Sequence, residues 1–290
     1  AYTYIILTAV FLGILLSTPS CELTDANINP NSPTEVPANV LLPFIESRLA
    51  SLMGTTPQVM AGIFMQYYEG VDNHPSQVQI YVINEALYVD WDWNDYYDGP
   101  MINLVKMIEV AETGGSYHYA GIGKIMMALI LGNVSSTWGD VPYSEALYGS
   151  EISSPVFDSQ QFIYETIQEL LDDGIADLNQ EYEGLKPTVD DIIFGGNMAK
   201  WKKTAYALKA RYFLHLTKRS DDLNYDPAQE ILKIIDDAIS ARDEDMEYPF
   251  GYSAAEYNPF YSYTLLNYIL PNPTFTQLMS ALNDPRKDFL

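Results

Sequence analysis

The sequence predicts a mainly α-helical fold with long irregular loops. Apolar residues recur with the period of an amphipathic helix in the stretches 101–111, 122–131, 162–178, 201–212 and 228–238. Two helices are expected to begin with Asp at the N-cap and Gln three residues later, at Asp158 and Asp226. The alternation typical of a β-strand is found only at 78–82, and weakly.

The helices are expected to pack as antiparallel pairs. Residues 93–113 pair with 117–137, and residues 159–179 pair with 198–218, at lengths typical of tetratricopeptide units. The tetratricopeptide consensus is not matched position by position, so the pattern predicts tetratricopeptide-like packing rather than a strict repeat. From residue 243 the chain is rich in Tyr, Pro and Asn, with no helical stripe before Leu265. This segment is predicted to be irregular, and long irregular segments are often functional.

Composition excludes some classes of function. The 290 residues contain 39 Asp and Glu against 15 Lys and Arg, a formal charge of -24. Such a chain would repel the phosphates of nucleic acids and disfavour anionic membrane surfaces. Tyrosine is unusually frequent, with 23 residues beside 11 Phe and 4 Trp. These aromatic side chains either fill a core or form a ligand site with apolar faces and polar tips.

The first residues have the pattern of an export signal. Residues 5–16 form an uncharged apolar run of secretory length, too short to span a bilayer, and residues 1–20 are predicted to be a lipoprotein signal peptide. The only cysteine, Cys21, follows directly and is predicted to carry a lipid anchor. Thr18 stands where a lipobox normally has Leu, and a plain secretory signal with an incidental cysteine is the alternative. Residues 21–38 are predicted to be an extended tether, and residues 39–290 the helical domain.

The densest group of aromatic and polar side chains lies at 90–99. We expect a ligand platform here, because sugar rings stack on aromatic faces and hydrogen-bond to amides. Its candidate residues are Trp91, Trp93, Asn94 and Tyr96. The alternative is that these rings form the buried start of the helix that continues to residue 113.

Asp90, Asp92 and Asn94 also have the oxygen spacing that begins an EF-hand loop. Asp95 stands where the loop needs Gly, and Met101 where it needs Glu, so the match fails. An irregular calcium site stays open as an alternative, and no cofactor is predicted.

A second aromatic cluster lies in the irregular segment, where Tyr257 and Tyr261 are further candidates for ligand binding. The other members of this cluster are Tyr252, Phe260 and Tyr263. A third group comprises Tyr67, Tyr68, Asp72 and Asn73. Loop packing is the alternative for both groups.

Signatures of catalysis are absent from the sequence. The three histidines, His74, His118 and His215, are dispersed and lack the spacing of metal ligands. There is no G-x-S-x-G motif, and Cys21 is expected to be blocked by lipid. We therefore predict no enzymatic activity, although paired carboxylates for glycoside hydrolysis stay open in so acidic a chain.

Several short tracts occur in the order known from one protein family. These are Asn29–Thr34 after the cysteine, the tract Trp138–Leu147 (WGDVPYSEAL), Phe157–Gln160, Gly195–Asn197, Lys200–Lys203, Pro249–Tyr252 and Asn283–Arg286. Together they resemble the SusD/RagB outer-membrane lipoproteins of Bacteroidota, particularly the SusD-like branch. Family members usually continue far beyond the last tract, so the chain resembles the N-terminal part of a longer protein.

The resemblance implies a specific function. SusD-like lipoproteins lie on the outer face of the outer membrane over a SusC-like, TonB-dependent β-barrel, bind glycans or peptides, and deliver them to that transporter. The alternative is a scaffold or assembly subunit that uses the same helical fold only to bind proteins of an outer-membrane complex. A ligand-binding protein should expose aromatic side chains in a concavity, whereas a scaffold should bury them or present them to another protein.

Overall fold

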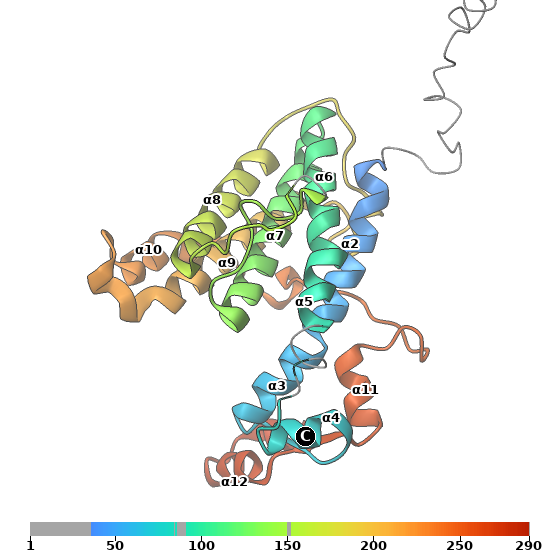
Figure 1. Cartoon of the computed structure of the whole chain (residues 1–290), viewed down its shortest axis with the longest axis vertical. Helices are drawn as coiled ribbons and strands as arrows, with labels where there is room; N and C mark the ends of the chain where they lie inside the picture. Colours follow the sequence, from blue (N-terminus) through green and yellow to red (C-terminus); the bar gives the residue numbers. More distant parts are fainter. Residues whose placement is uncertain (1–35, 84, 86–90, 150–151, 290) are drawn as a thin grey trace, which may run out of the picture. The chain divides into compact units, whose positions relative to one another are not determined.

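The computed structural model describes residues 36–83, 85, 91–149 and 152–289. The predicted signal peptide (1–20), Cys21 and most of the predicted tether (21–38) lie outside the described residues. Residues 37–290 group into one unit by their contacts. The structure confirms the mainly α-helical class, with helices along most of this unit (Figure 1).

The centre of the helical body is α7 (Tyr117–Trp138), which contacts α2 (Ala38–Met53), α6 (Ile102–Thr113), α8 (Gln160–Leu178) and α9 (Met198–Leu216). Among the described helices only α7 is long and apolar enough to cross a membrane, but 78% of the relevant window is buried in the protein. It is therefore the core helix that the sequence predicts at 122–131. The predicted pairs are also confirmed, because α6 packs on α7 and α8 packs on α9.

Glycines allow the helices of this body to approach closely. A Cβ atom added at Gly121 of α7 would lie 2.8 Å from the carbonyl oxygen of Gly174 on α8. At Gly132 an added Cβ would lie 2.1 Å from the ring of Tyr212 on α9. The Tyr212 hydroxyl donates to the Leu129 carbonyl at 3.2 Å, so the ring is fixed in the space that Gly132 leaves.

The two predicted helix starts have different outcomes. Asp226 caps α10 (Pro227–Ile234) as predicted, and its side chain accepts from the backbone N–H of Ala228 at 2.9 Å. At α8 the prediction is wrong, because Ser159 is the N-cap. Asp158 instead accepts from the backbone N–H groups of Tyr143 and Ser144, both at 2.8 Å. Hydrogen bonds to residues distant in sequence have replaced the N-cap bond that the sequence predicts for Asp158.

A second group of short elements surrounds a small core of its own. It comprises α3 (Thr56–Phe64), β1 (Tyr68–Gly70), α4 (Asn73–Gln79), α11 (Pro259–Leu265), β2 (Ile269–Pro271) and α12 (Pro273–Ala281). β1 and β2 pair antiparallel, which brings residues 200 positions apart together, and α3, α4, α11 and α12 gather in Figure 1. We call residues 54–83 and 251–283 the low-charge lobe. The expected strand at 78–82 is wrong, since α4 runs to Gln79, and α11 begins six residues before the first helix expected in this region.

The stripe at 228–238 forms α10 followed by a short 3-10 turn. Among its apolar residues only Ala238 is buried. Leu232 is 67% exposed and Ile235 is 46% exposed.

Candidate functional site

Aromatic rings gather around Trp93 of α5 (Trp91–Tyr96). Trp93 stacks on Tyr97 with ring centroids 4.8 Å apart, and meets the edge of Trp138 at 5.4 Å. Phe157 also stacks on Trp93, with ring centroids 6.2 Å apart, and is 66% exposed. The half-buried Trp93 ring is thus the centre of an aromatic cluster that reaches the surface.

Long-range contacts hold this cluster in place. The Tyr97 hydroxyl donates to the Pro142 carbonyl at 2.7 Å, which ties the π-helical turn after α5 to the loop that follows α7. Val141 and Asp158 exchange two backbone hydrogen bonds, at 3.1 and 3.0 Å, and so bring Phe157 beside Trp138 and Trp93. Asn94 is exposed next to the cluster. The side chain of Trp91 lies outside what the structure describes.

The expectation that the Tyr96 ring is exposed is wrong. Tyr96 is 1% exposed and its ring packs edge-on against Trp138 at 6.1 Å. Burial, and then the Asp92 carboxylate, raise its pKa. α5 turns one face inward, and Tyr96 is on that face while Asn94 is not.

Two carboxylates, Asp92 and Asp95, lie on α5 between the aromatic residues of the cluster. Asp92 is 6% exposed, and burial together with the neighbouring Asp95 raises its pKa to about 7. Asp95 forms an ion pair with Arg48 of α2 at 3.0 Å. Asp90, from the calcium alternative, lies outside the described residues. Within the described part of the chain, no three His, Cys, Asp or Glu side chains come together as metal ligands.

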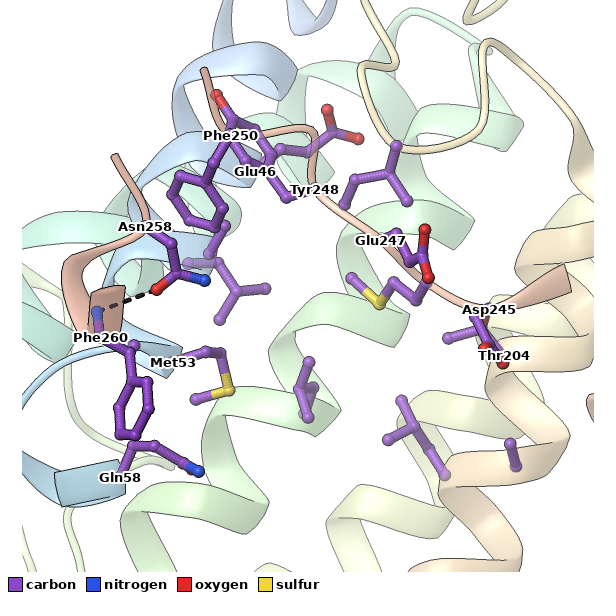
Figure 2. Close-up of a pocket in the computed structure, with 18 of the residues that line it drawn as sticks. Glu46, Met53, Gln58, Thr204, Asp245, Glu247, Tyr248, Phe250, Asn258 and Phe260 are labelled. Carbon is purple, nitrogen blue, oxygen red and sulfur yellow. Dashed lines mark hydrogen bonds between the residues drawn. The ribbon is translucent and has the colours of Figure 1, made fainter. Parts of the chain in front are cut away.

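A larger concavity of about 760 Å³ lies between α2 and α9 (Figure 2). Its apolar side is formed by residues of α2, α7 and α9, namely Leu49, Met53, Leu129, Ala207 and Leu208. The segment 245–250 contributes Tyr248, Phe250 and Glu247. Two cation contacts hold the chain just before this segment: Lys203 of α9 pairs with Glu244 at 2.5 Å, and the Lys200 ammonium donates to the Asp243 carbonyl.

Half-buried aromatic rings and polar groups share this pocket. Tyr68 and Phe260 line it from the low-charge lobe, with ring centroids 5.1 Å apart. Asn258 also lines it, and its side-chain oxygen caps α11 by accepting from the backbone N–H of Phe260 at 2.9 Å (Figure 2). Arg211 and Gln58 add donors at the edge. A cavity of this size with partly exposed rings and amides could hold a small oligomeric ligand.

The structure places Tyr257 and Tyr261 against each other, edge to face at 5.2 Å. Neither lines the pocket, whereas their neighbours Asn258 and Phe260 do. The predicted segment therefore reaches the pocket through Asn258 and Phe260, and not through Tyr257 and Tyr261. The Asn258-Pro259 pair is typical of a helix start and marks the beginning of α11.

One wall of the pocket contains a buried pair of carboxyl groups. Glu46 lines the pocket, is fully buried, and accepts from the backbone N–H of Ile192 at 2.8 Å. Burial, and then Asp191, raise the pKa of Glu46 to about 9. Asp191 accepts from Trp201 Nε1 at 2.8 Å and from two backbone N–H groups at 2.9 Å. Glu46 is therefore neutral at pH 7 and Asp191 remains a fully bonded acceptor.

The histidines lie apart from both sites. His118 Nε2 donates to the Gln180 carbonyl at 3.2 Å, and His215 Nδ1 lies 2.9 Å from the Tyr164 hydroxyl. Burial lowers the pKa of both rings. Neither ring lines the 760 Å³ pocket.

Comparisons with known proteins agree on one family. The model of a SusD-like family, described as "Starch-binding associating with outer membrane", matches residues 30–290. A SusD/RagB family protein from Bacteroides thetaiotaomicron superposes with a TM-score of 0.74 at 26% identity, over 87% of this chain and 53% of that one. The search of curated protein sequences finds no significant match.

Two further structures show the same fold. A SusD homolog from Bacteroides fragilis has a TM-score of 0.64 at 21% identity, over 83% of this chain and 51% of its own. A chitin-binding SusD homolog from Flavobacterium johnsoniae has a TM-score of 0.66 at 19% identity, over 85% and 53%. The chain spans about half the length of these structures. The family match over nearly all of the described residues, together with the shared fold, shows that the chain belongs to the SusD-like family.

Proposed function

We propose that the chain is a cell-surface lipoprotein that binds glycans or peptides and passes them to a SusC-like, TonB-dependent barrel. Membership of a family described as starch-binding and associated with the outer membrane supports nutrient binding. The main structural support is that half-exposed aromatic rings lie in a concavity, as a binding protein requires and a pure scaffold does not. On this proposal the protein is anchored through Cys21 on the outer face of the membrane.

The proposal includes no covalent chemistry. Aromatic rings, amides and scattered carboxylates bind a neutral polymer, and catalysis would need a positioned acid and base. Asp92 has a raised pKa, as a general acid would, but its neighbour Asp95 is held in an ion pair with Arg48. We therefore propose a binding protein, not an enzyme.

Within this function we propose two contact regions for the ligand. The first is the surface of the aromatic cluster, with Trp91, Trp93 and Asn94 as ligand residues. The second is the 760 Å³ pocket with the segment 245–250. Tyr257 and Tyr261 are neighbours of the lining residues Asn258 and Phe260 and stay proposed as ligand residues. Tyr96 belongs to neither, because it is buried.

Calorimetric titration of the detergent-purified protein with starch oligosaccharides, chitin oligosaccharides and mixed peptides tests this function. Trp93→Ala and Phe250→Ala should each weaken binding about fivefold, since a stacked ring contributes roughly 1 kcal/mol. Phe162→Ala is the control, because this exposed ring of α8 lies outside both regions. Failure of the wild-type protein to bind any of the three ligand classes would favour the scaffold alternative.

A further inference from the structure

A smaller cavity of about 180 Å³ lies between the start of α8, the end of α9 and the 3-10 turn Thr217–Asp222 with the loop that follows it. It shares no lining residue with the 760 Å³ pocket, and none of its lining residues belongs to the aromatic cluster around Trp93. Its volume equals that of roughly six water molecules. The cavity therefore admits one ring-sized group and not an oligomer.

The imidazole of His215 is fixed at this cavity. Its Nδ1 lies 2.9 Å from the Tyr164 hydroxyl, and the Tyr212 ring meets it at 90° with centroids 5.6 Å apart. Tyr164 is 8% exposed and Tyr212 is 2% exposed, so these contacts join the imidazole to the core of the helical body. Burial, and then Arg211, lower the pKa of His215. The ring is thus neutral at pH 7, and its Nε2 can donate or accept one further hydrogen bond.

Tyr225 and two leucines give the cavity an apolar side. Phe213 packs against the half-buried Tyr225 ring at 77°, with centroids 5.9 Å apart, and holds it in place. Leu216 and Leu223 are also half-buried and line the same cavity. Sugar rings have apolar C–H faces that pack on such side chains, so this side suits the face of one pyranose ring.

Four polar groups at the cavity have unused hydrogen-bonding capacity within the described part of the chain. Gln160 Nε2 donates to a backbone carbonyl of α7 at 2.9 Å, which leaves its Oε1 as an acceptor. Arg219 donates through Nε to Asp222 at 2.7 Å, which leaves its two terminal NH₂ groups as donors. His215 Nε2 and the Tyr225 hydroxyl can each donate or accept. Several hydroxyl groups on one ring match this mixture, whereas an amino-acid side chain has a single polar end.

The charges at the cavity are balanced. Arg219 forms an ion pair with Asp222, and the carboxylate of Glu165 lines the same cavity. The guanidinium of Arg211 lies near enough to His215 to lower its pKa. Two positive and two negative charges favour neither a cation nor an anion, so the ligand that fits is neutral.

We propose that this cavity binds one neutral pyranose unit, with the C–H face of the sugar on Tyr225 and its hydroxyl groups bonded to Gln160, Arg219 and His215. This site goes beyond the proposed function, because it is separate from both contact regions described above. It would persist in a protein whose main ligand is a peptide, and in a scaffold subunit that binds no nutrient.

NMR of the histidine rings tests this proposal on the whole chain. The protein has three histidines, so the His215 signal can be assigned with a His215→Gln variant. Glucose and galactose represent free sugars, and methyl glucoside represents the end of a glycan chain. We expect at least one of them to shift the His215 signal, with a Kd on the order of 1–10 mM for a ligand of about a dozen heavy atoms, and to leave the His74 and His118 signals in place.

Two results would overturn the proposal. The first is an unchanged His215 signal with all three sugars up to about 100 mM, well above the expected Kd. The second is a larger shift with glucosamine, glucuronate or the amides of N-acetylarginine and N-acetyltyrosine, which would mean that the cavity selects charge or a peptide side chain. The His215 signal reports this cavity alone, so failure here is distinguishable from failure of binding at the two contact regions.

Variants of the lining residues give a second measurement. Tyr225→Ala should raise the Kd about tenfold, because it removes the apolar face, and Tyr225→Phe about threefold, because it removes only the hydroxyl. Phe162→Ala is the matched control, since this exposed ring of α8 does not line the cavity, and should leave the Kd unchanged. If Tyr225→Ala does not fold, Tyr225→Phe and Arg219→Ala serve in its place. A Kd that is unchanged in both of these variants would also overturn the proposal.

Discussion

Glu46 of α2 and Asp191, 145 positions later in the chain, are two buried carboxyl groups, and Asp191 together with burial raises the pKa of Glu46. Asp191 receives three N–H donors, and Glu46 Oε2 receives the N–H of Ile192. Glu46 Oε1 is buried without a hydrogen-bond partner, which favours the neutral form of this carboxyl group. The pair fastens the turn before α9 to α2, and so forms one wall of the pocket.

This pair should make the stability of the protein depend on pH. The pKa of Glu46 is about 9 in the folded protein against an ordinary value of 4.5, so between these values the unfolded chain binds fewer protons. The free energy of unfolding should therefore fall as pH rises from about 4.5 to about 9. Glu46→Gln keeps a donor toward Asp191 and should flatten this decline in urea titrations at pH 5, 7 and 9.

A matched variant separates the hydrogen bonds from the charge. Glu46→Leu leaves Asp191 and the Ile192 N–H each without one partner, and should lower the free energy of unfolding by about 1–3 kcal/mol at pH 5. If Glu46→Gln lost as much stability as Glu46→Leu, a stabilising role for the hydrogen bonds of the Glu46 side chain would be refuted.

The ionisation of Asp92 should also lower the free energy of unfolding as pH rises, but over a lower range of pH. Its pKa is raised to about 7 by burial and by Asp95, so its ionisation destabilises the folded state as pH rises from about 4 to 7. Asp92→Asn should therefore raise the free energy of unfolding by about 2 kcal/mol at pH 8 and by little at pH 4. Thermal melts at the two pH values measure this. A stabilisation that is equal at both would point to packing instead of charge.

Lys124 bridges two helices through two carboxylates, at 2.7 Å from Glu112 of α6 and 2.7 Å from Asp177 of α8. Its side chain is largely buried, so Lys124→Met would leave the buried Asp177 charge unpaired and should lower the free energy of unfolding by about 3 kcal/mol. The exposed pair of Lys233 and Glu230 is the control, and Lys233→Met should change stability by less than about 0.5 kcal/mol. Similar losses in the two variants in denaturant titrations would contradict the bridge.

Gly132→Ala should test the close approach of α7 and α9. The added methyl would overlap the Tyr212 ring and displace it, which would break the hydrogen bond from the Tyr212 hydroxyl to the Leu129 carbonyl. We therefore expect the free energy of unfolding to fall by about 2–4 kcal/mol. At Gly99 an added Cβ meets only the flexible Arg48 side chain at 3.6 Å, and Gly99→Ala should lie within about 1 kcal/mol of wild type. Calorimetric melting compares them; an unaffected Gly132→Ala protein would mean that Tyr212 can move.

Cys21→Ala should release the protein from the membrane fraction, because the proposed lipid anchor would have no attachment point. Immunoblots of washed membranes from cells with the wild-type and variant proteins measure the distribution. Cys21→Ala protein that stays membrane-bound after washing would refute the anchor. In mild detergent, the wild-type protein should co-purify with a large β-barrel.

The sequence by itself determined the helical class, because helix formation depends on an apolar period of 3.6 residues and on local caps such as Asp226. It also determined that α7 is central, since a helix with Lys124 as its only charge must be buried among others. Where a side chain could bond either to a neighbour in sequence or to a distant residue, the capping pattern in the sequence did not predict its partner. The Asp158 side chain accepts hydrogen bonds from the backbone N–H groups of residues 143 and 144, and Ser159 caps α8 in its place.

Only the tertiary structure decided the sites. The period of α5 places Tyr96 inward and Asn94 outward, but the neighbours that bury Tyr96 and flank Trp93, namely Trp138 and Phe157, come from other parts of the chain. The 760 Å³ pocket likewise joins α2, α9 and the segment 245–250, which share no sequence pattern. The raised pKa of Glu46 depends on burial and on Asp191, a neighbour 145 residues away. A pKa shift of that kind is a property of the folded environment, because desolvation and a second carboxylate act only once the chain has brought them together.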